Sequence, residues 1–132
     1  MRVGFAQFRP LFGEVEANIE RSAAFAGSLD CDLIVLPELC TTGYNFSSHE
    51  ELEQLAEPVP GGPACTAWRD IARQTGRCIV AGIAERSESG IFNSSVLVKP
   101  DGTVHVYRKV HLFHREKDWF EPGVGFAVHD IG

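Results

Sequence analysis

Two charged residues stand where predicted strands give way to loops, and together they have the chemistry for general-base catalysis with oxyanion stabilisation. Glu38 directly follows the apolar run of residues 32–36, and Lys109 follows the second strand of a predicted hairpin. A carboxylate partly removed from water has a raised pKa, which suits a general base. A lysine beside it would stay charged and stabilise a developing oxyanion. The alternative is a structural Glu–Lys ion pair at a loop junction.

The elements that must position these residues alternate between apolar strands and amphipathic helices. Helices are predicted from apolar residues at helical spacing over 14–29, 49–56 and 63–75. Strands are predicted over 3–8, 32–36 and 78–84, with a hairpin of 92–99 and 103–107 around the Asp101-Gly102 turn. Residues 37–48 and 57–62 are expected to be irregular, and 126–128 to begin another strand. This order predicts an α/β fold with a mixed sheet and helices on one face.

Composition limits the class of protein. The 132 residues fit one domain, and 44% hydrophobic residues suffice for a core. Twelve basic against 18 acidic residues give a net charge of −6, which argues against nucleic-acid or anionic-membrane partners. No apolar run approaches the roughly 20 residues of a membrane span, and no signal segment is recognisable, so the expected location is cytoplasmic. Neither a cofactor nor a metal is expected, because the histidines complete no known ligand spacing.

Several short motifs occur in a specific order along essentially the whole chain. They are Val3-Gly4-Phe5-Ala6-Gln7, Leu36-Pro37-Glu38, Thr42-Gly43-Tyr44, Asn93-Ser94, Pro100-Asp101-Gly102 and the run Tyr107–Phe113, followed by Glu116, Phe120 and Pro122-Gly123. In this order and spacing the chain resembles the nitrilase, or carbon–nitrogen hydrolase, superfamily of amidases, nitrilases and carbamoylases. Each motif alone is weak, but the combination is highly specific.

The resemblance implies an αββα sandwich, with residues 1–132 as the N-terminal half of a single hydrolase domain. It also implies a Glu–Lys–Cys triad that hydrolyses amide, carbamoyl or nitrile substrates through a thioester, in a homodimer or larger assembly. By position, Glu38 would be the general base, Lys109 would hold the oxyanion, and Glu116 would orient the substrate and the lysine. Tyr44 and Phe113 are candidates for lining the substrate pocket, although loop packing explains them as well.

The nucleophile of such a triad is missing from this chain. No cysteine follows Lys109, whereas the family carries its nucleophile well downstream of the lysine. The four cysteines present match no nucleophile motif and are expected to be reduced packing residues; they are Cys31, Cys40, Cys65 and Cys78. The chain is therefore part of a longer protein, a truncated product, or a half-domain completed by another chain, and we favour the first. The competing function is an inactive fragment or pseudo-enzyme that acts through protein contacts.

Overall fold

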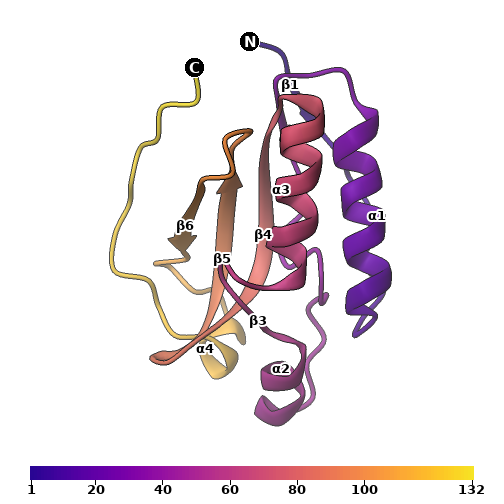
Figure 1. The fold of residues 1–132 in the computed structure, drawn as a ribbon. Helices are drawn as coiled ribbons and strands as arrows, with labels where there is room; N and C mark the ends of the chain where they lie inside the picture. The colour runs from indigo at the N-terminus through magenta and orange to yellow at the C-terminus, as the bar shows by residue number, and fades with distance from the viewer.

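Six strands form one mixed sheet in the computed structural model, which describes residues 1–132 (Figure 1). The sheet order is β1-β2-β4-β5-β6, and the short β3 pairs with β4. The strands are β1 (Val3–Phe5), β2 (Leu33–Val35), β3 (Glu57–Pro58), β4 (Cys78–Ser87), β5 (Gly90–Val98) and β6 (Val104–Arg108). The pairs β1–β2, β2–β4 and β3–β4 are parallel, and β4–β5–β6 are antiparallel. The predicted mixed α/β sheet is therefore confirmed.

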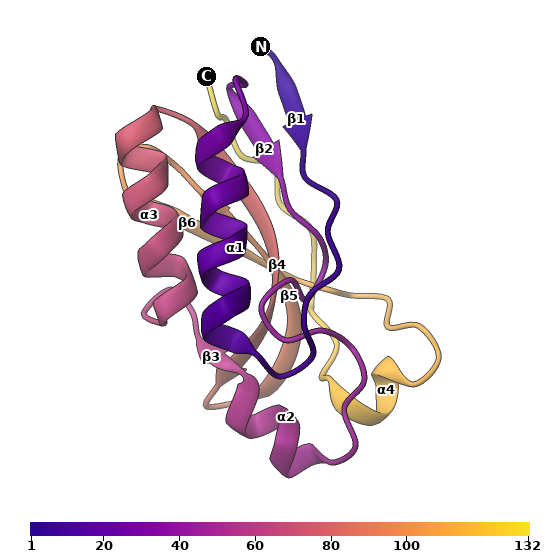
Figure 2. The ribbon, with the colours of Figure 1, turned by 90° about the vertical axis from the view of Figure 1, so that its right-hand side faces the viewer.

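Two long helices cover one face of this sheet. Helices α1 (Val15–Ser28) and α3 (Pro63–Thr75) lie side by side, as Figure 2 shows. The indole Nε1 of Trp68 on α3 donates to Ser22 Oγ on α1 at 2.9 Å, and both side chains are buried. Between these helices and the sheet lie fully buried apolar side chains such as Ile34, Ile79 and Val96. Each stabilises the fold by about 1.5–3 kcal/mol.

The remaining helices are short and lie at one end of the sheet, near the site that is described below. Helix α2 (His49–Leu55) begins at Ser48, whose side chain accepts from the Glu51 N–H. Helix α4 (Glu116–Trp119) is a single turn that the sequence pattern did not predict. None of the helices combines the length and hydrophobicity that crossing a membrane requires.

Three sequence predictions about strands were wrong in detail. The first strand ends at Phe5 rather than at residue 8, because its sheet neighbour β2 ends at Val35, just before Pro37. The segment 57–62, expected to be a connector, begins with the two-residue strand β3. Residues 126–128 form no strand: the ring of Phe126 stacks on Tyr107 with 5.8 Å between centroids, and the backbone makes no sheet pairing.

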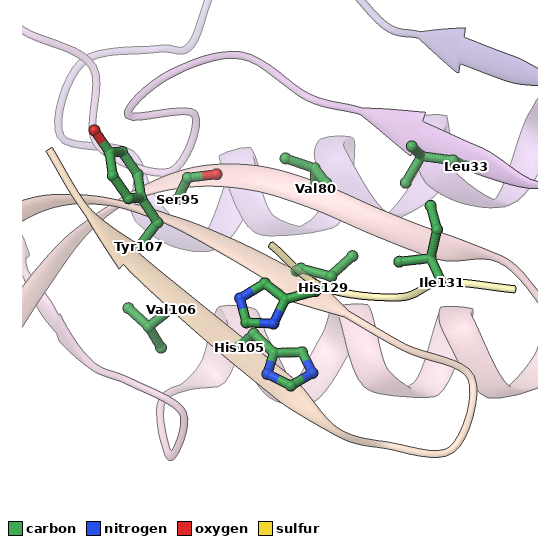
Figure 3. Close-up of a pocket in the computed structure, with 9 residues that line it drawn as sticks. Leu33, Val80, Ser95, His105, Val106, Tyr107, His129 and Ile131 are labelled. Atoms are coloured by element: carbon green, nitrogen blue, oxygen red, sulfur yellow. The ribbon is translucent and has the colours of Figure 1, made fainter. Parts of the chain in front are cut away.

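The second face of the sheet carries a mainly apolar row that the rest of the chain covers only in part. Strand register places Phe5, Val35, Val80, Leu97 and His105 in one line across all five strands of the main path. Phe5 is 73% exposed. Figure 3 shows part of this face, where the stacked imidazole rings of His105 and His129 lie beside a shallow hollow of about 260 Å³. An exposed apolar row of this kind marks a surface suited to packing against further protein.

Candidate active site

The three polar residues singled out in the sequence meet at one point beyond the end of β2. Lys109 Nζ donates to Glu38 Oε1 and to Glu116 Oε1, in both cases at 2.8 Å. The side chains are 41% exposed for Glu38, 29% for Lys109 and 13% for Glu116. Glu38 follows β2, Lys109 follows β6, and Glu116 opens α4. The predicted convergence of a carboxylate and an ammonium group is thus present, while their catalytic roles stay predictions.

The position of Glu38 depends on close contact between its loop and β4. The Cys40 N–H donates to the Gly82 carbonyl at 2.9 Å, and the Gly82 N–H donates to the Pro37 carbonyl at 3.1 Å. A Cβ atom at Gly82 would overlap the Cα of Glu38, so only glycine fits there. Leu39 adopts a positive φ of 45° and is fully buried, which turns the chain sharply after the carboxylate.

The backbone of Lys109 is held from both sides. Its N–H donates to the Asn93 carbonyl on β5, and its own carbonyl accepts from the Gly123 N–H, each at 2.9 Å. A Cβ atom at Gly123 would overlap the carbonyl oxygen of Arg108. The chain after β6 is therefore fixed at the residue that carries the ammonium group.

A buried ion pair supports the strand that precedes the lysine. The guanidinium group of Arg108 binds the Glu85 carboxylate with two hydrogen bonds, of 3.0 Å and 2.5 Å, and stacks over the Phe92 ring. Ser94 Oγ donates to the same carboxylate at 2.6 Å. Because the Glu85 side chain is only 4% exposed, these partners supply the hydrogen bonds that water cannot provide to its carboxylate.

One polar partner of the cluster had no role assigned from the sequence. Asn93 Nδ2 donates to Glu38 Oε1 at 2.6 Å and to Glu116 Oε1 at 3.1 Å, and the residue is 3% exposed. The available signal was an asparagine inside a strand, where this residue type is disfavoured.

Polar contacts keep Glu38 and Lys109 charged at neutral pH. Burial alone would raise the pKa of Glu38, but polar contacts from Lys109, Tyr44 and Asn93 outweigh burial and lower that pKa to about 2. Burial likewise opposes the charge on Lys109, yet hydrogen bonds to Glu116 and Glu38 raise its pKa. The arrangement thus presents an ionised carboxylate able to accept a proton, next to an ammonium group able to donate hydrogen bonds.

The site opens into two hollows. One, of about 340 Å³, has Glu38, Asn93 and Lys109 among its lining residues and continues towards Val35 and Val80 of the second sheet face. The other, of about 300 Å³, is lined mainly by the loop that holds Glu116 and by aromatic rings. A substrate of a few heavy atoms fits either hollow.

Both predicted substrate-binding residues lie beside the second hollow. Tyr44 is 47% exposed, and burial together with the neighbouring charges of Glu38 and Glu116 raises its pKa. Phe113 is 78% exposed, and its N–H donates to Glu116 Oε2 at 2.7 Å. Their location is compatible with substrate contact, which stays a prediction.

The cysteines of the chain lie elsewhere. All four are unpaired and buried, and none lines the two hollows at the cluster. Cys40, two residues after Glu38, is fully buried in the main core, and burial raises the pKa of its thiol to about 12. A thiol of this kind packs as a small apolar group and is a poor nucleophile. The structure also contains no cluster of three or more histidine, cysteine or acidic side chains arranged to hold a metal ion.

Comparisons with known proteins identify the family of the chain. Residues 2–132 match the family model described as "Carbon-nitrogen hydrolase", and the chain belongs to this family. It is 43% identical over 136 residues to a nitrilase of Pyrococcus abyssi (strain GE5 / Orsay), a match that covers 100% of this chain and 52% of the relative. It is 36% identical over 132 residues to an (R)-stereoselective amidase of Pseudomonas sp, covering 97% and 46%.

Solved structures agree with the sequence matches. A CN-hydrolase superfamily protein of Xanthomonas campestris with an arsenic adduct in its active site superposes with a TM-score of 0.84 and 28% identity, covering 95% of this chain and 47% of that one. An N-terminal amidase structure gives a TM-score of 0.83 at 25% identity, covering 93% and 31%. The chain thus spans about half the length of the curated relatives named above.

Proposed function

We propose that residues 1–132 form the N-terminal part of a single hydrolase domain that cleaves non-peptide carbon–nitrogen bonds in small amide, carbamoyl or nitrile substrates. The observation that carries this proposal is the Lys109 ammonium group bound at 2.8 Å by two carboxylates, Glu38 and Glu116. An isolated structural ion pair needs one carboxylate, whereas this site has two, beside a hollow large enough for a substrate.

In the proposed reaction on an amide, Glu38 accepts the proton of a cysteine thiol supplied from outside this chain. The thiolate attacks the carbonyl carbon, and Lys109 donates a hydrogen bond to the oxyanion that develops. As the C–N bond breaks, the leaving nitrogen takes the proton from Glu38 and departs as ammonia or an amine. Water then attacks the thioester, with Glu38 accepting its proton and returning it to the sulfur, which releases the acid.

The proposed roles agree with the electrostatics of the cluster. While Lys109 donates to Glu38, the carboxylate is stabilised in its charged form and is a weak base. When the ammonium group turns towards the oxyanion, Glu38 loses a donor, and its pKa rises at the stage at which it must hold a proton. Glu116 continues to bind the lysine and keeps it charged.

The test uses the natural gene product that contains this chain. Purified protein is incubated with a primary amide, an N-carbamoyl amino acid and a nitrile, while ammonia release is followed and intact mass is recorded during turnover. The proposal expects ammonia from at least one substrate class and a covalent adduct that hydroxylamine removes, as expected of a thioester. Absence of both with every class rejects it.

The second candidate function is an inactive fragment that acts through protein contacts. The mainly apolar row that includes Phe5 and Val35 favours it, because such a surface suits a protein partner. It expects a gene product with a mass near 14.5 kDa and no adduct with any substrate. Assembly as a homodimer or larger oligomer is a separate proposal, which light scattering of the gene product tests.

A further inference from the structure

Asn93 is the one residue that contacts all three members of the charged cluster. Its side-chain amide donates to Glu38 Oε1 and Glu116 Oε1, and its backbone carbonyl accepts from the Lys109 N–H. It belongs to β5, an interior strand of the sheet, where it pairs with Ala84 of β4. A side chain on a central strand is held more firmly than one on a loop.

The hydrogen bonds around Asn93 form a closed arrangement of two donors and two acceptors. Lys109 Nζ and Asn93 Nδ2 each donate to the same two oxygens, Glu38 Oε1 and Glu116 Oε1. Two carboxylates that share one ammonium group repel each other, and the side chain of lysine imposes little direction on its partners. The planar amide adds directed donors without adding charge, so it offsets this repulsion and fixes where both oxygens lie.

We propose that Asn93 is a positioning residue that holds Glu38 and Glu116 in place while Lys109 is free to donate to a substrate oxygen. The catalytic consequence rests on the proposed hydrolase function, whereas the hydrogen bonding itself does not. If Lys109 alone held the cluster, its turning towards an oxyanion would release both carboxylates. With the amide of Asn93 in place, Glu38 keeps a donor and its orientation throughout the reaction.

This role predicts a measurable change in the acidity of Glu38. The charged and titratable groups that face Glu38 are Lys109, Glu116 and Tyr44, and Asn93 is its neutral donor. Removing that donor leaves the carboxylate less stabilised in its charged form, so its pKa rises. A hydrogen bond to a charged group corresponds to a shift of about one pH unit or more.

The experiment compares Asn93→Leu and Asn93→Asp with a matched control in the gene product that contains this chain. Asn18 is also buried, and its amide binds only the backbone of Leu11 and Thr41, so Asn18→Leu removes a buried amide that has no hydrogen bond to Glu38, Lys109 or Glu116. Glutamate carboxyl carbons are labelled with 13C and titrated by NMR, with the Glu38 signal assigned by its loss in Glu38→Gln. The pH dependence of kcat and of kcat/KM is measured in parallel.

The expected result for Asn93→Leu is an upward shift of about one pH unit in the Glu38 titration and in the acid limb of kcat/KM. Its kcat falls about tenfold or more with KM changed less than threefold, as expected for loss of alignment rather than of binding. Asn93→Asp raises the pKa of Glu38 as well, because it adds a negative charge beside that carboxylate. Asn18→Leu lowers the melting temperature but leaves the pKa of Glu38 and the acid limb of kcat/KM unchanged.

Two outcomes overturn the inference: an unchanged Glu38 titration in folded Asn93→Leu, or a shift of equal size in Asn18→Leu. If Asn93→Leu does not fold, Asn93→Ala, which removes the amide without adding a charge, decides by the same titration. A wild-type protein without turnover counts against the proposed function alone, because the titration still tests the hydrogen bonding of Asn93.

Discussion

Gly82 and Glu38 are in backbone contact, so closely that a methyl group on Gly82 would overlap the Cα of Glu38. The position of the Glu38 carboxylate therefore depends on the absence of a side chain at residue 82 of the neighbouring strand β4. Gly82→Ala should push the loop that follows β2 away from β4 and destabilise the fold by about 1–3 kcal/mol, as overpacking does. Urea denaturation of the chain measures this loss, and ammonia release by the complete gene product should fall as well.

Gly61→Ala is the matched control, since a Cβ atom there meets no atom within 4 Å and its φ is not positive. It should change the free energy of unfolding by no more than about 0.5 kcal/mol. Equal effects of the two substitutions would show that the contact with Glu38 is unimportant.

Removing either proposed catalytic charge should abolish most turnover without unfolding the protein. We expect Glu38→Gln to lower kcat by about 10²–10⁴-fold through loss of a general base. Lys109→Ala should lower it by about 10²–10³-fold through loss of the oxyanion donor. The exposed residues Glu53 and Lys117 supply controls, and Glu53→Gln and Lys117→Ala should keep wild-type rates. Ammonia release under saturating substrate distinguishes these results, and full activity in both site variants would reject the assignment.

The ion pair of Arg108 and Glu85 should matter far more to stability than exposed pairs do. Arg108→Met leaves the 4% exposed Glu85 carboxylate without its charged partner, which costs about 3–5 kcal/mol. Arg115→Met removes a pair with Asp118 in which both side chains are about two-thirds exposed, and it should cost less than about 1 kcal/mol. Urea titrations of both variants make the comparison. Similar losses in the free energy of unfolding for the two variants would mean that the burial of Glu85 does not strengthen its ion pair with Arg108.

Acid should destabilise the wild-type chain partly through Glu38. Its pKa is lowered from 4.5 to about 2 in the folded state, so the folded state favours the ionised form. The resulting stabilisation is present above pH 4.5 and is lost as the pH falls through about 2. Glu38→Gln should therefore lose less stability than the wild type over this window. Urea denaturation at a series of acidic pH values tests this prediction. The same pH dependence of the free energy of unfolding in the wild type and in Glu38→Gln would contradict it.

Glu57 should have the opposite effect on the pH dependence of stability, because its pKa is raised rather than lowered. Its Oε2 accepts from the Ala64 N–H at the start of α3, where Gly62 offers no capping side chain, and its Oε1 has no partner. Burial raises its pKa above 4.5, so its favourable contribution is present below that pH and is lost as the pH rises through the raised value. In Glu57→Gln this group no longer ionises, so the free energy of unfolding should depend less on pH between acidic and neutral conditions. Thermal unfolding between acidic and neutral pH measures the slope, and an unchanged slope would refute the prediction.

Much of this architecture follows from periodicity. The two long helices were predicted to within one residue of their observed ends, because apolar residues at helical spacing face the sheet. The tail was predicted wrongly: Phe126 and Val128 are apolar, but the ring of Phe126 packs on Tyr107 and the tail backbone joins no strand. Apolar character indicates burial or pairing only where the topology supplies a partner.

The site was predictable in part. Glu38 and Lys109 stand at strand ends, a position that favours chemistry in α/β sheets, and motif order linked them to Glu116. The part played by Asn93 in the cluster was not visible, because it depends on register: Lys109 lies beside Asn93 only once β5 and β6 are paired. Gly82 was missed for the same reason, as its close contact belongs to a loop 44 positions earlier in the chain.

Glu116 divides its two oxygens between different parts of the molecule, with Oε1 on the Lys109 ammonium group and Oε2 on the Phe113 N–H. Because Oε2 is bound by a backbone N–H, the side chain of Glu116 depends on the conformation of the segment that begins at Phe113. A ligand that shifted this segment would therefore also change the hydrogen bond between Glu116 and the Lys109 ammonium group, without contacting the lysine.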